Sequence, residues 1–272
     1  MVKSVKKFYE GSAKREWGRL IEDPYHKMEF DTTLHFLKKY LPRKGLILDA
    51  GGGPGRYTIE LAKQGYDVIL LDIAPSNLEI AKKQIKNKIL QNKVKEIVEG
   101  SITDLSKFPD NRFDAVICLG GPLSHVLDKK KIDKAILELT RVAKKGAPIF
   151  VSVMSRLSLL ASALRLFPDE IDQPRFKKYR DTGDYIGNYG FTACHFFLPE
   201  ELKKSFEKKD LKFLEMVGLE GIGSNFRKET NELSKNKKRW KVWLDTHYRT
   251  CTHPVVVGIS EHILIIVRKE LN

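Results

Sequence analysis

Residues 48–57 place four glycines and a proline in one short turn, directly after an apolar run. The segment reads Leu-Asp-Ala-Gly-Gly-Gly-Pro-Gly-Arg-Tyr. Glycine lets the backbone turn sharply and pass close to a ligand, and the helix predicted to follow offers unpaired amide hydrogens at its start. A glycine-rich turn between a buried strand and a helix is typical of nucleotide-binding α/β sheets. This feature constrains the fold more than any other in the chain.

The spacing of these glycines distinguishes between ligand classes. The dinucleotide fingerprint G-x-G-x-x-G fails, because counting from Gly51 or Gly53 puts an arginine or a threonine at the last glycine position. A phosphate-binding P-loop also fails, since no Gly-Lys-Ser/Thr follows. The loop instead reads D-x-G-x-G-x-G, from Asp49 to Gly55.

From residue 45 onward, short apolar runs alternate with helical periodicities. This alternation predicts βα units and a parallel sheet. Gly65 suits the left-handed residue that ends a helix, and Pro75 suits a first helical turn because proline has no amide hydrogen to leave unpaired. We expect helices around 58–62, 75–85, 132–143, 199–206 and 231–244, and strands at 46–48, 68–71, 94–98, 113–119, 148–154, 211–217 and 263–267.

Three regions depart from this rhythm and suggest a cap. Aromatic residues among charges in the first forty residues indicate amphipathic helices on or over the sheet. Two prolines and a run of Gly, Asp and Tyr make a poor sheet element later in the chain, and a further irregular stretch separates the last two strands. Ligands of open α/β sheets bind at the carboxyl ends of the strands, which such pieces would cover. The expected parts are an N-terminal helical cap segment (1–40), the ligand-binding core (41–154), an insertion in the cap or substrate region (155–198), and a C-terminal part of the core sheet (199–272) with the insertion 220–260.

The charge of the chain raises nucleic acid as a candidate partner. Lys and Arg number 49 against 35 Asp and Glu, a formal net charge of +14, and such an excess attracts phosphates at long range. The lysines are spread over helix faces, however, as on ordinary solvated surfaces. One basic and aromatic concentration stands out, Arg227-Lys228 and 235–241 with Trp240 and Trp243. We favour an exposed helix whose tryptophans face the core over an RNA site.

The terminal segments bear on the cellular location of the protein, and the cysteine spacing bears on metal binding. The first 17 residues lack the apolar core of a signal peptide, and the apolar stretch 255–267 is interrupted by Glu261 and His262. We therefore expect a cytoplasmic protein outside the membrane. The three cysteines are far apart and form no CxxC pair, so neither a zinc site nor a disulfide framework is indicated: Cys118, Cys194 and Cys251.

The loop at 49–55, Asp72 after the second strand and Asp104 after the third together resemble the class I S-adenosylmethionine-dependent methyltransferases. The likeness covers about 45–154 well and the rest in outline. It implies an α/β fold, a Rossmann-like seven-stranded, mostly parallel sheet with helices on both faces and a partly helical cap. It also implies methyl transfer from S-adenosylmethionine to an acceptor. Large insertions over the sheet edge favour a small-molecule acceptor, with O-, N- or C-methylation left open.

The resemblance further implies which residues contact the cofactor. Asp49 would lie near the methionine part, above the loop residues Gly51 and Gly53, because an acid suits a ligand whose amino group and sulfonium are cationic. Asp72 would accept hydrogen bonds from the ribose hydroxyls, although an aspartate at this position, like Asp104, would also suit a helix cap. The contacts implied around the adenine are Ile73, Asp104, Leu105 and Leu119.

His125, after the fourth strand, is the first candidate for a general base. Positioning and exclusion of water supply much of the rate of methyl transfer, so only some acceptors need a base. A structural or cofactor-contacting role for His125 is an equal alternative. Weaker catalytic candidates lie in the first insertion: Asp181, Tyr185, Tyr189 and His195. Side chains near the N-terminus suit either closure over the sulfonium or, as we favour, helix packing: Tyr9, Trp17, Tyr25 and His26.

Three other functions remain open from the sequence. The charge supports an RNA or protein methyltransferase, although residues 119–123 read Leu-Gly-Gly-Pro-Leu instead of the Asn/Asp-Pro-Pro-Tyr/Phe motif that orients a nucleic-acid base amine. A non-catalytic module that only binds S-adenosylmethionine is the second, and a nicotinamide oxidoreductase the third. The oligomeric state and the acceptor are not predicted.

Overall fold

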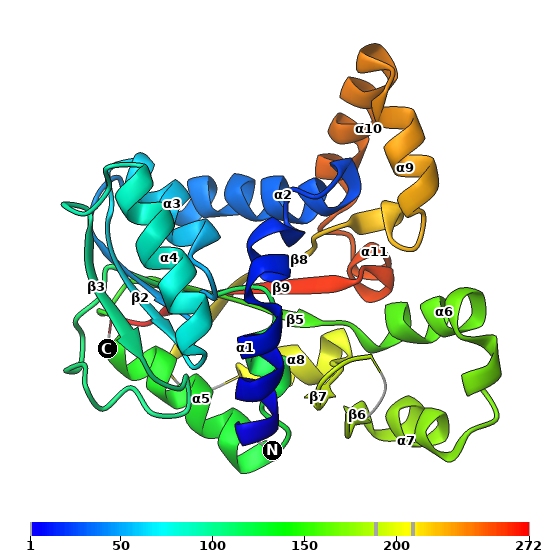
Figure 1. Ribbon diagram of the computed structural model, residues 1–272, viewed down its shortest axis with the longest axis horizontal. Coiled ribbons are helices and arrows are strands. Elements are labelled where there is room, and N and C mark those ends of the chain that lie inside the picture. Colours follow the sequence, from blue (N-terminus) through cyan, green and yellow to red (C-terminus); the bar gives the residue numbers. More distant parts are fainter. Residues whose placement is uncertain (1, 188–189, 208–209, 272) are drawn as a thin grey trace.

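The computed structural model describes residues 2–187, 190–207 and 210–271. Its centre is a seven-stranded sheet in the order β3-β2-β1-β4-β5-β9-β8 (Figure 1). All neighbours pair in parallel except β9, which is antiparallel to both β5 and β8. The predicted fold class and all seven predicted strands are confirmed. The strands are β1 (Leu46–Ala50), β2 (Asp67–Asp72), β3 (Val94–Glu99), β4 (Ala115–Cys118), β5 (Pro148–Met154), β8 (Leu211–Gly218) and β9 (His262–Lys269).

The middle strands are apolar on both faces because helices cover both sides of the sheet. One face carries α2 (Pro24–Tyr40), α3 (Arg56–Lys63) and α4 (Pro75–Asn87), and the other carries α5 (Lys129–Val142) and α8 (Pro199–Ser205). Strand β4 is shorter than the predicted 113–119. Phe113 makes only an isolated bridge, to Ala143, and the chain turns away after Leu119 through Gly120, whose φ is +79°.

The predicted helix ends follow from local chemistry. Pro75 occupies the first turn of α4, and Gly65 adopts the left-handed backbone just after α3, with φ +95°. The stripe predicted for α5 is buried against the sheet: Ile132, Ala135, Ile136 and Leu139.

The remaining segments surround this core. Helix α1 (Val2–Arg19) packs against α4 at the carboxyl edge of the parallel strands. Residues 156–187 and 190–195 form a projection to one side (Figure 1). It contains α6 (Arg156–Leu166), a 3₁₀ turn η2 (Pro168–Glu170), α7 (Pro174–Thr182) and a small sheet of β6 (Asp184–Tyr185) and β7 (Cys194–His195). The sequence had not predicted these two short strands.

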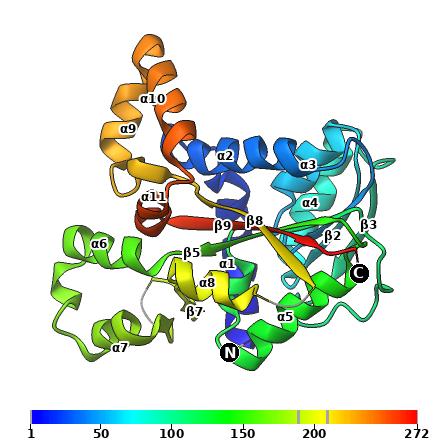
Figure 2. The same cartoon turned by 180° about the vertical axis from the view of Figure 1, so that it is seen from behind.

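The second irregular stretch is helical. After a 3₁₀ turn, η3 (Gly221–Gly223), α9 (Arg227–Ser234) and α10 (Lys237–Thr250) stand out from the body as a hairpin, followed by α11 (Pro254–Ile259) (Figure 2). The lysines of α10 are exposed, whereas Trp240 and Trp243 are partly covered. This arrangement agrees with the favoured interpretation of an exposed helix. No helix in the described part of the chain is both long and apolar enough to cross a bilayer.

Candidate functional site

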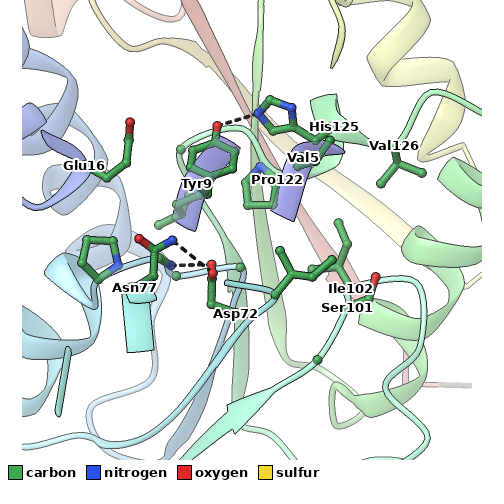
Figure 3. Close-up of a pocket in the computed structure, with 18 of the residues that line it drawn as sticks. Val5, Tyr9, Glu16, Asp72, Asn77, Ser101, Ile102, Pro122, His125 and Val126 are labelled. Atoms are coloured by element: carbon green, nitrogen blue, oxygen red, sulfur yellow. Dashed lines mark hydrogen bonds between the residues drawn. The ribbon is translucent and has the colours of Figure 1, made fainter. Parts of the chain in front are cut away.

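A cavity opens at the carboxyl ends of β1, β2 and β4, between the glycine loop and α1 (Figure 3). Two opposite sides of this cavity are distinguished below. The floor comprises the loop at 51–53 with Asp49, Asp72 and Asn77. The roof comprises the residues of α1 and of the turn after it that line the cavity: Val5, Tyr9, Glu16, Arg19 and Leu20. Six of the nine predicted site residues line the cavity: Gly51, Gly53, Asp72, Ile73, Leu119 and His125.

The backbone conformation and close packing of the loop require glycine at position 51. Gly51 has φ +78°, and its amide donates to the Leu71 carbonyl at 2.7 Å. A Cβ on Gly51 would lie 2.6 Å from Pro122 across the cavity wall. The amide of Gly53 donates to Asp72 Oδ2 at 2.9 Å. The loop is therefore tied to the end of β2 and closely packed against the turn that follows β4.

Asp72 and Asn77 form the polar end of the floor (Figure 3). Asp72 Oδ1 accepts hydrogen bonds from the Ala74 amide at 2.9 Å and from Asn77 Nδ2 at 3.1 Å. Asn77 is 2% exposed, lines the cavity, and its Oδ1 has no hydrogen-bond partner. Burial raises the pKa of Asp72. Hydrogen-bond acceptors thus line the place where the resemblance puts two ribose hydroxyls.

Asp49 lies beneath the loop and does not line the cavity. Thr58 Oγ1 donates to its Oδ2 at 2.6 Å, while Oδ1 has no partner. A Cβ on Gly52 would lie 2.4 Å from the Asp49 carboxyl, so the glycine loop rests directly on this group. Burial, together with the nearby charge of Asp72, raises the pKa of Asp49 to about 7. Neither carboxyl is bonded to a cationic side chain of the described residues, which leaves the floor electronegative.

Asp104 and Leu105 do not line the cavity. Asp104 is exposed, and its Oδ1 accepts from the Ser106 amide at 3.1 Å. Leu105 is fully buried in the core. A bridge between Ser101 and Asp104 turns the chain back after β3, so the cavity is lined instead by Ser101, Ile102 and Thr103. The residues that come first after β3 line the cavity, so closeness to the strand end predicts a lining residue better than an acidic side chain does.

His125 lines the cavity, but both of its ring nitrogens have partners. Nδ1 lies 3.0 Å from the Ala193 carbonyl oxygen, and Nε2 lies 2.7 Å from Tyr9 Oη. Burial lowers the pKa of His125 to about 4 and raises that of Tyr9. The imidazole is therefore neutral at pH 7, and the phenol keeps its proton. Sequence reasoning missed this pair because its members are 116 residues apart.

The other aromatic and histidine candidates of the N-terminal segment do not line the cavity. Trp17 stacks under the Arg56 guanidinium, 3.7 Å from the ring centroid. The Tyr25 hydroxyl accepts from the Asn225 amide, and His26 bonds to Asp23 at 2.8 Å. Packing is thus the role of Trp17, Tyr25 and His26, as favoured, while Tyr9 faces the cavity.

The candidates of the first insertion lie away from the cavity. His195 is held between Asp184 at 2.7 Å and Glu201 at 2.8 Å. Asp181 pairs with Arg180 on the surface, and Tyr185 is buried in a separate apolar cluster. Tyr189 lies outside the described residues.

The segments predicted to form a cap differ in their relation to the cavity. Within 155–187, 190–198 and 220–260, no residue lines the cavity, so α1 alone covers it from outside the core. The described residues of the first insertion contact the cavity only through His125. The Ala193 carbonyl oxygen is bonded to the imidazole, and the Phe191 ring lies 5.6 Å from it.

Arg19 brings a charged group into the roof that the sequence analysis had not singled out. Its Nη1 donates to Glu29 Oε2 at 2.5 Å and its Nη2 donates to Oε1 at 3.1 Å. Behind this pair, His262 Nδ1 lies 2.6 Å from Glu220 Oε1. Glu29 and Glu220 together raise the pKa of His262 to about 9. The cations Arg19 and His262 therefore balance the carboxylates Glu29 and Glu220. Glu29, Glu220 and His262 also lie close enough together to hold a metal ion.

Comparisons with known proteins relate this chain to methyltransferases. Residues 47–146 match a family model described as a methyltransferase domain. The chain is 30% identical to a glycine/sarcosine N-methyltransferase of Parasynechococcus marenigrum, over 47% of this chain and 44% of the relative. It is 36% identical to a ubiquinone/menaquinone biosynthesis C-methyltransferase of Zymomonas mobilis, over 40% of this chain and 43% of the relative. The chain thus spans less than half the length of these curated relatives.

A structural neighbour extends the likeness to the whole fold. A S-adenosylmethionine-dependent methyltransferase of Methanosarcina mazei superposes with a TM-score of 0.61 at 20% identity, covering 87% of this chain and 98% of the neighbour. The strand order, the glycine loop at the end of β1 and the domain match agree with one another. Residues 47–146 match a methyltransferase domain, and the chain shares its fold with a S-adenosylmethionine-dependent methyltransferase.

Proposed function

We propose that this protein transfers a methyl group from S-adenosylmethionine to a small-molecule acceptor. The observation that carries the proposal is the floor of the cavity, where two buried carboxyls without bonded cations lie at and below a glycine loop. A buried negative potential favours a cationic ligand. It disfavours the pyrophosphate of a nicotinamide dinucleotide, which is the cofactor of the oxidoreductase alternative.

The described residues fit this cofactor. Asp72 Oδ2 and the unpartnered Oδ1 of Asn77 are acceptors for ribose hydroxyls. Ile73 and Ile102 line the part of the cavity that would hold the adenine, next to the hydroxyls of Ser101 and Thr103. Leu119, a further contact implied by the resemblance, also lines the cavity. When bound, S-adenosylmethionine supplies an electrophilic methyl group on a sulfonium.

The size of the acceptor is inferred from the roof. Helix α1 lies over the cavity and places Tyr9, Glu16 and Arg19 at its lining, a covered site of the kind that suits a small molecule. The relatives named for small acceptors, glycine and sarcosine among them, support the same class. The basic residues of α10 are exposed on a hairpin that stands out from the body, so they lend the RNA alternative no contact with the cavity (Figure 1).

The cellular setting is also part of the proposal. The three cysteines are buried and unbridged, as in reducing compartments. We propose a cytoplasmic location on this ground.

Calorimetry and label transfer test the function together. We expect S-adenosylmethionine and S-adenosylhomocysteine to bind with one site per chain, and NAD⁺ to give no heat of binding. Methyl-labelled S-adenosylmethionine is then incubated with a panel of small amines, phenols and hydroquinones, and separately with total tRNA. Binding of NAD⁺ alone would refute the proposal, cofactor binding without transfer to any acceptor would favour a non-catalytic module, and transfer to tRNA alone would favour the RNA alternative.

A further inference from the structure

We propose that Tyr9 is a catalytic residue whose hydroxyl oxygen accepts a hydrogen bond from an N–H of the acceptor, so that the acceptor is a neutral primary or secondary amine. His125 is then a positioning residue that acts through Tyr9. This inference rests on the proposed function and specifies the substrate class of the same cavity.

The tautomer of His125 follows from its neighbours. A backbone carbonyl oxygen only accepts hydrogen bonds, so the contact of 3.0 Å to Ala193 requires the ring proton on Nδ1. In the neutral ring, Nε2 then carries a lone pair and accepts from the Tyr9 hydroxyl at 2.7 Å. The direction of this hydrogen bond is fixed, because no proton is left on Nε2 to point the other way.

The fixed direction determines what Tyr9 offers to a ligand. Its single hydroxyl proton is used on His125, so the oxygen presents only lone pairs to the cavity that Tyr9 lines (Figure 3). The ring itself is held edge-on between Phe8, at 5.3 Å between centroids, and His125, at 5.2 Å. A ligand that meets this oxygen must be a donor.

The chemistry of the pair distinguishes amines from hydroxyl compounds. A phenol or alcohol must lose its proton near the transition state and needs a base of suitable strength. The buried imidazole, with a pKa near 4, is a poor base. A neutral amine needs none. Its lone pair would form the new N–C bond as the methyl carbon–sulfur bond of the cofactor breaks, and the bonding electrons would stay on sulfur to give neutral S-adenosylhomocysteine. The methylated ammonium would lose its N–H proton to solvent after it leaves Tyr9. The charged groups that act on Tyr9 are Glu16 and Arg19 on α1 and Asp72 on β2, with the Cys194 thiol of β7 beside them.

Three variants test the pair, and calorimetry with S-adenosylhomocysteine tests the underlying function separately. Tyr9→Phe is expected to lower kcat/KM about tenfold to a hundredfold, because the acceptor N–H loses its buried partner. Its affinity for S-adenosylhomocysteine should stay within twofold of the wild type. Tyr25→Phe is the matched control, since Tyr25 belongs to the same N-terminal segment and lies off the cavity.

The double variant separates positioning from a structural role. In His125→Asn, the Tyr9 proton is free to turn toward the amine lone pair, and kcat/KM should fall by a similar factor. Adding His125→Asn to Tyr9→Phe should cause no further loss. A further loss in the double variant, or wild-type activity in Tyr9→Phe, would overturn the proposal.

Two further measurements decide the inference. With methyl-labelled S-adenosylmethionine, we expect transfer to members of a panel of primary and secondary amines that begins with glycine and sarcosine. Dimethylglycine and hydroquinone should not be methylated. Transfer to only these two, or to no amine of the panel, would overturn the substrate class. In ¹⁵N-histidine NMR at pH 7, His125 should carry its proton on Nδ1, and Tyr9→Phe should shift its Nε2 signal. A proton on Nε2 would overturn the proposal even if cofactor binding were confirmed.

Discussion

The floor and the roof of the cavity are built in different ways. The floor is mostly backbone. Its glycine loop is held by amide hydrogen bonds to Leu71 and Asp72, at the end of the strand that follows in the chain. The roof is a row of side chains on α1 that meets His125 across 116 residues of sequence. The floor can accept one kind of ligand, whereas the roof can change with the side chains that α1 presents.

The largest expected effect tests the floor. Gly51→Ala should lower the affinity for S-adenosylhomocysteine at least a hundredfold, because the new Cβ meets Pro122 at 2.6 Å. Calorimetry measures the loss. Gly65→Ala is the matched control, since Gly65 also has a positive φ, +95°, but nothing within 4 Å of the added atom. Both variants cost roughly 1–2 kcal/mol in backbone strain. Equal affinities in the two would contradict the close packing of the loop.

The carboxylate of the floor gives the next effect. Asp72→Ala should weaken binding of S-adenosylmethionine by about 1–3 kcal/mol, through the loss of acceptors for the ribose and of the bond to Gly53. Asp67→Ala at the other end of β2 serves as the control. Unchanged calorimetric affinity in Asp72→Ala would refute this assignment.

The burial of His125 beside the roof should make the free energy of unfolding depend on pH. The pKa of His125 is about 4 in the folded protein, below the value of about 6.5 in an unfolded chain. Between pH 6.5 and 4 the unfolded state therefore binds a proton that the folded state does not, and His125 destabilises the fold increasingly as pH falls. His125→Asn should gain stability relative to the wild type across this window, as measured by urea unfolding at fixed pH. A constant difference would mean that His125 titrates normally.

The smallest change in cofactor affinity is expected for a residue just outside the cavity. Asp104→Ala should leave the affinity for S-adenosylmethionine within twofold of the wild type, because the side chain caps Ser106 outside the cavity. A loss comparable to that of Asp72→Ala would restore the role that the sequence had suggested.

These differences also explain what was predictable. The strands, the glycine loop and Asp72 were predictable because their signals lie within short windows of apolar runs and turn residues. Asp104 was misplaced because a one-turn reversal after β3 decides which of four neighbouring residues faces the cavity. The contact between Tyr9 and His125 carries no local signal, and it exists only because α1 folds back over the sheet.

The attachment of α1 has a consequence for access to the cavity. This helix is joined to the core by side-chain contacts, such as those of Lys6 with Glu99 and Trp17 with Arg56, and not by strand pairing. Contacts of this kind break without disturbing a sheet. Opening of the cavity on this side therefore requires the displacement of one helix, and no strand has to unpair.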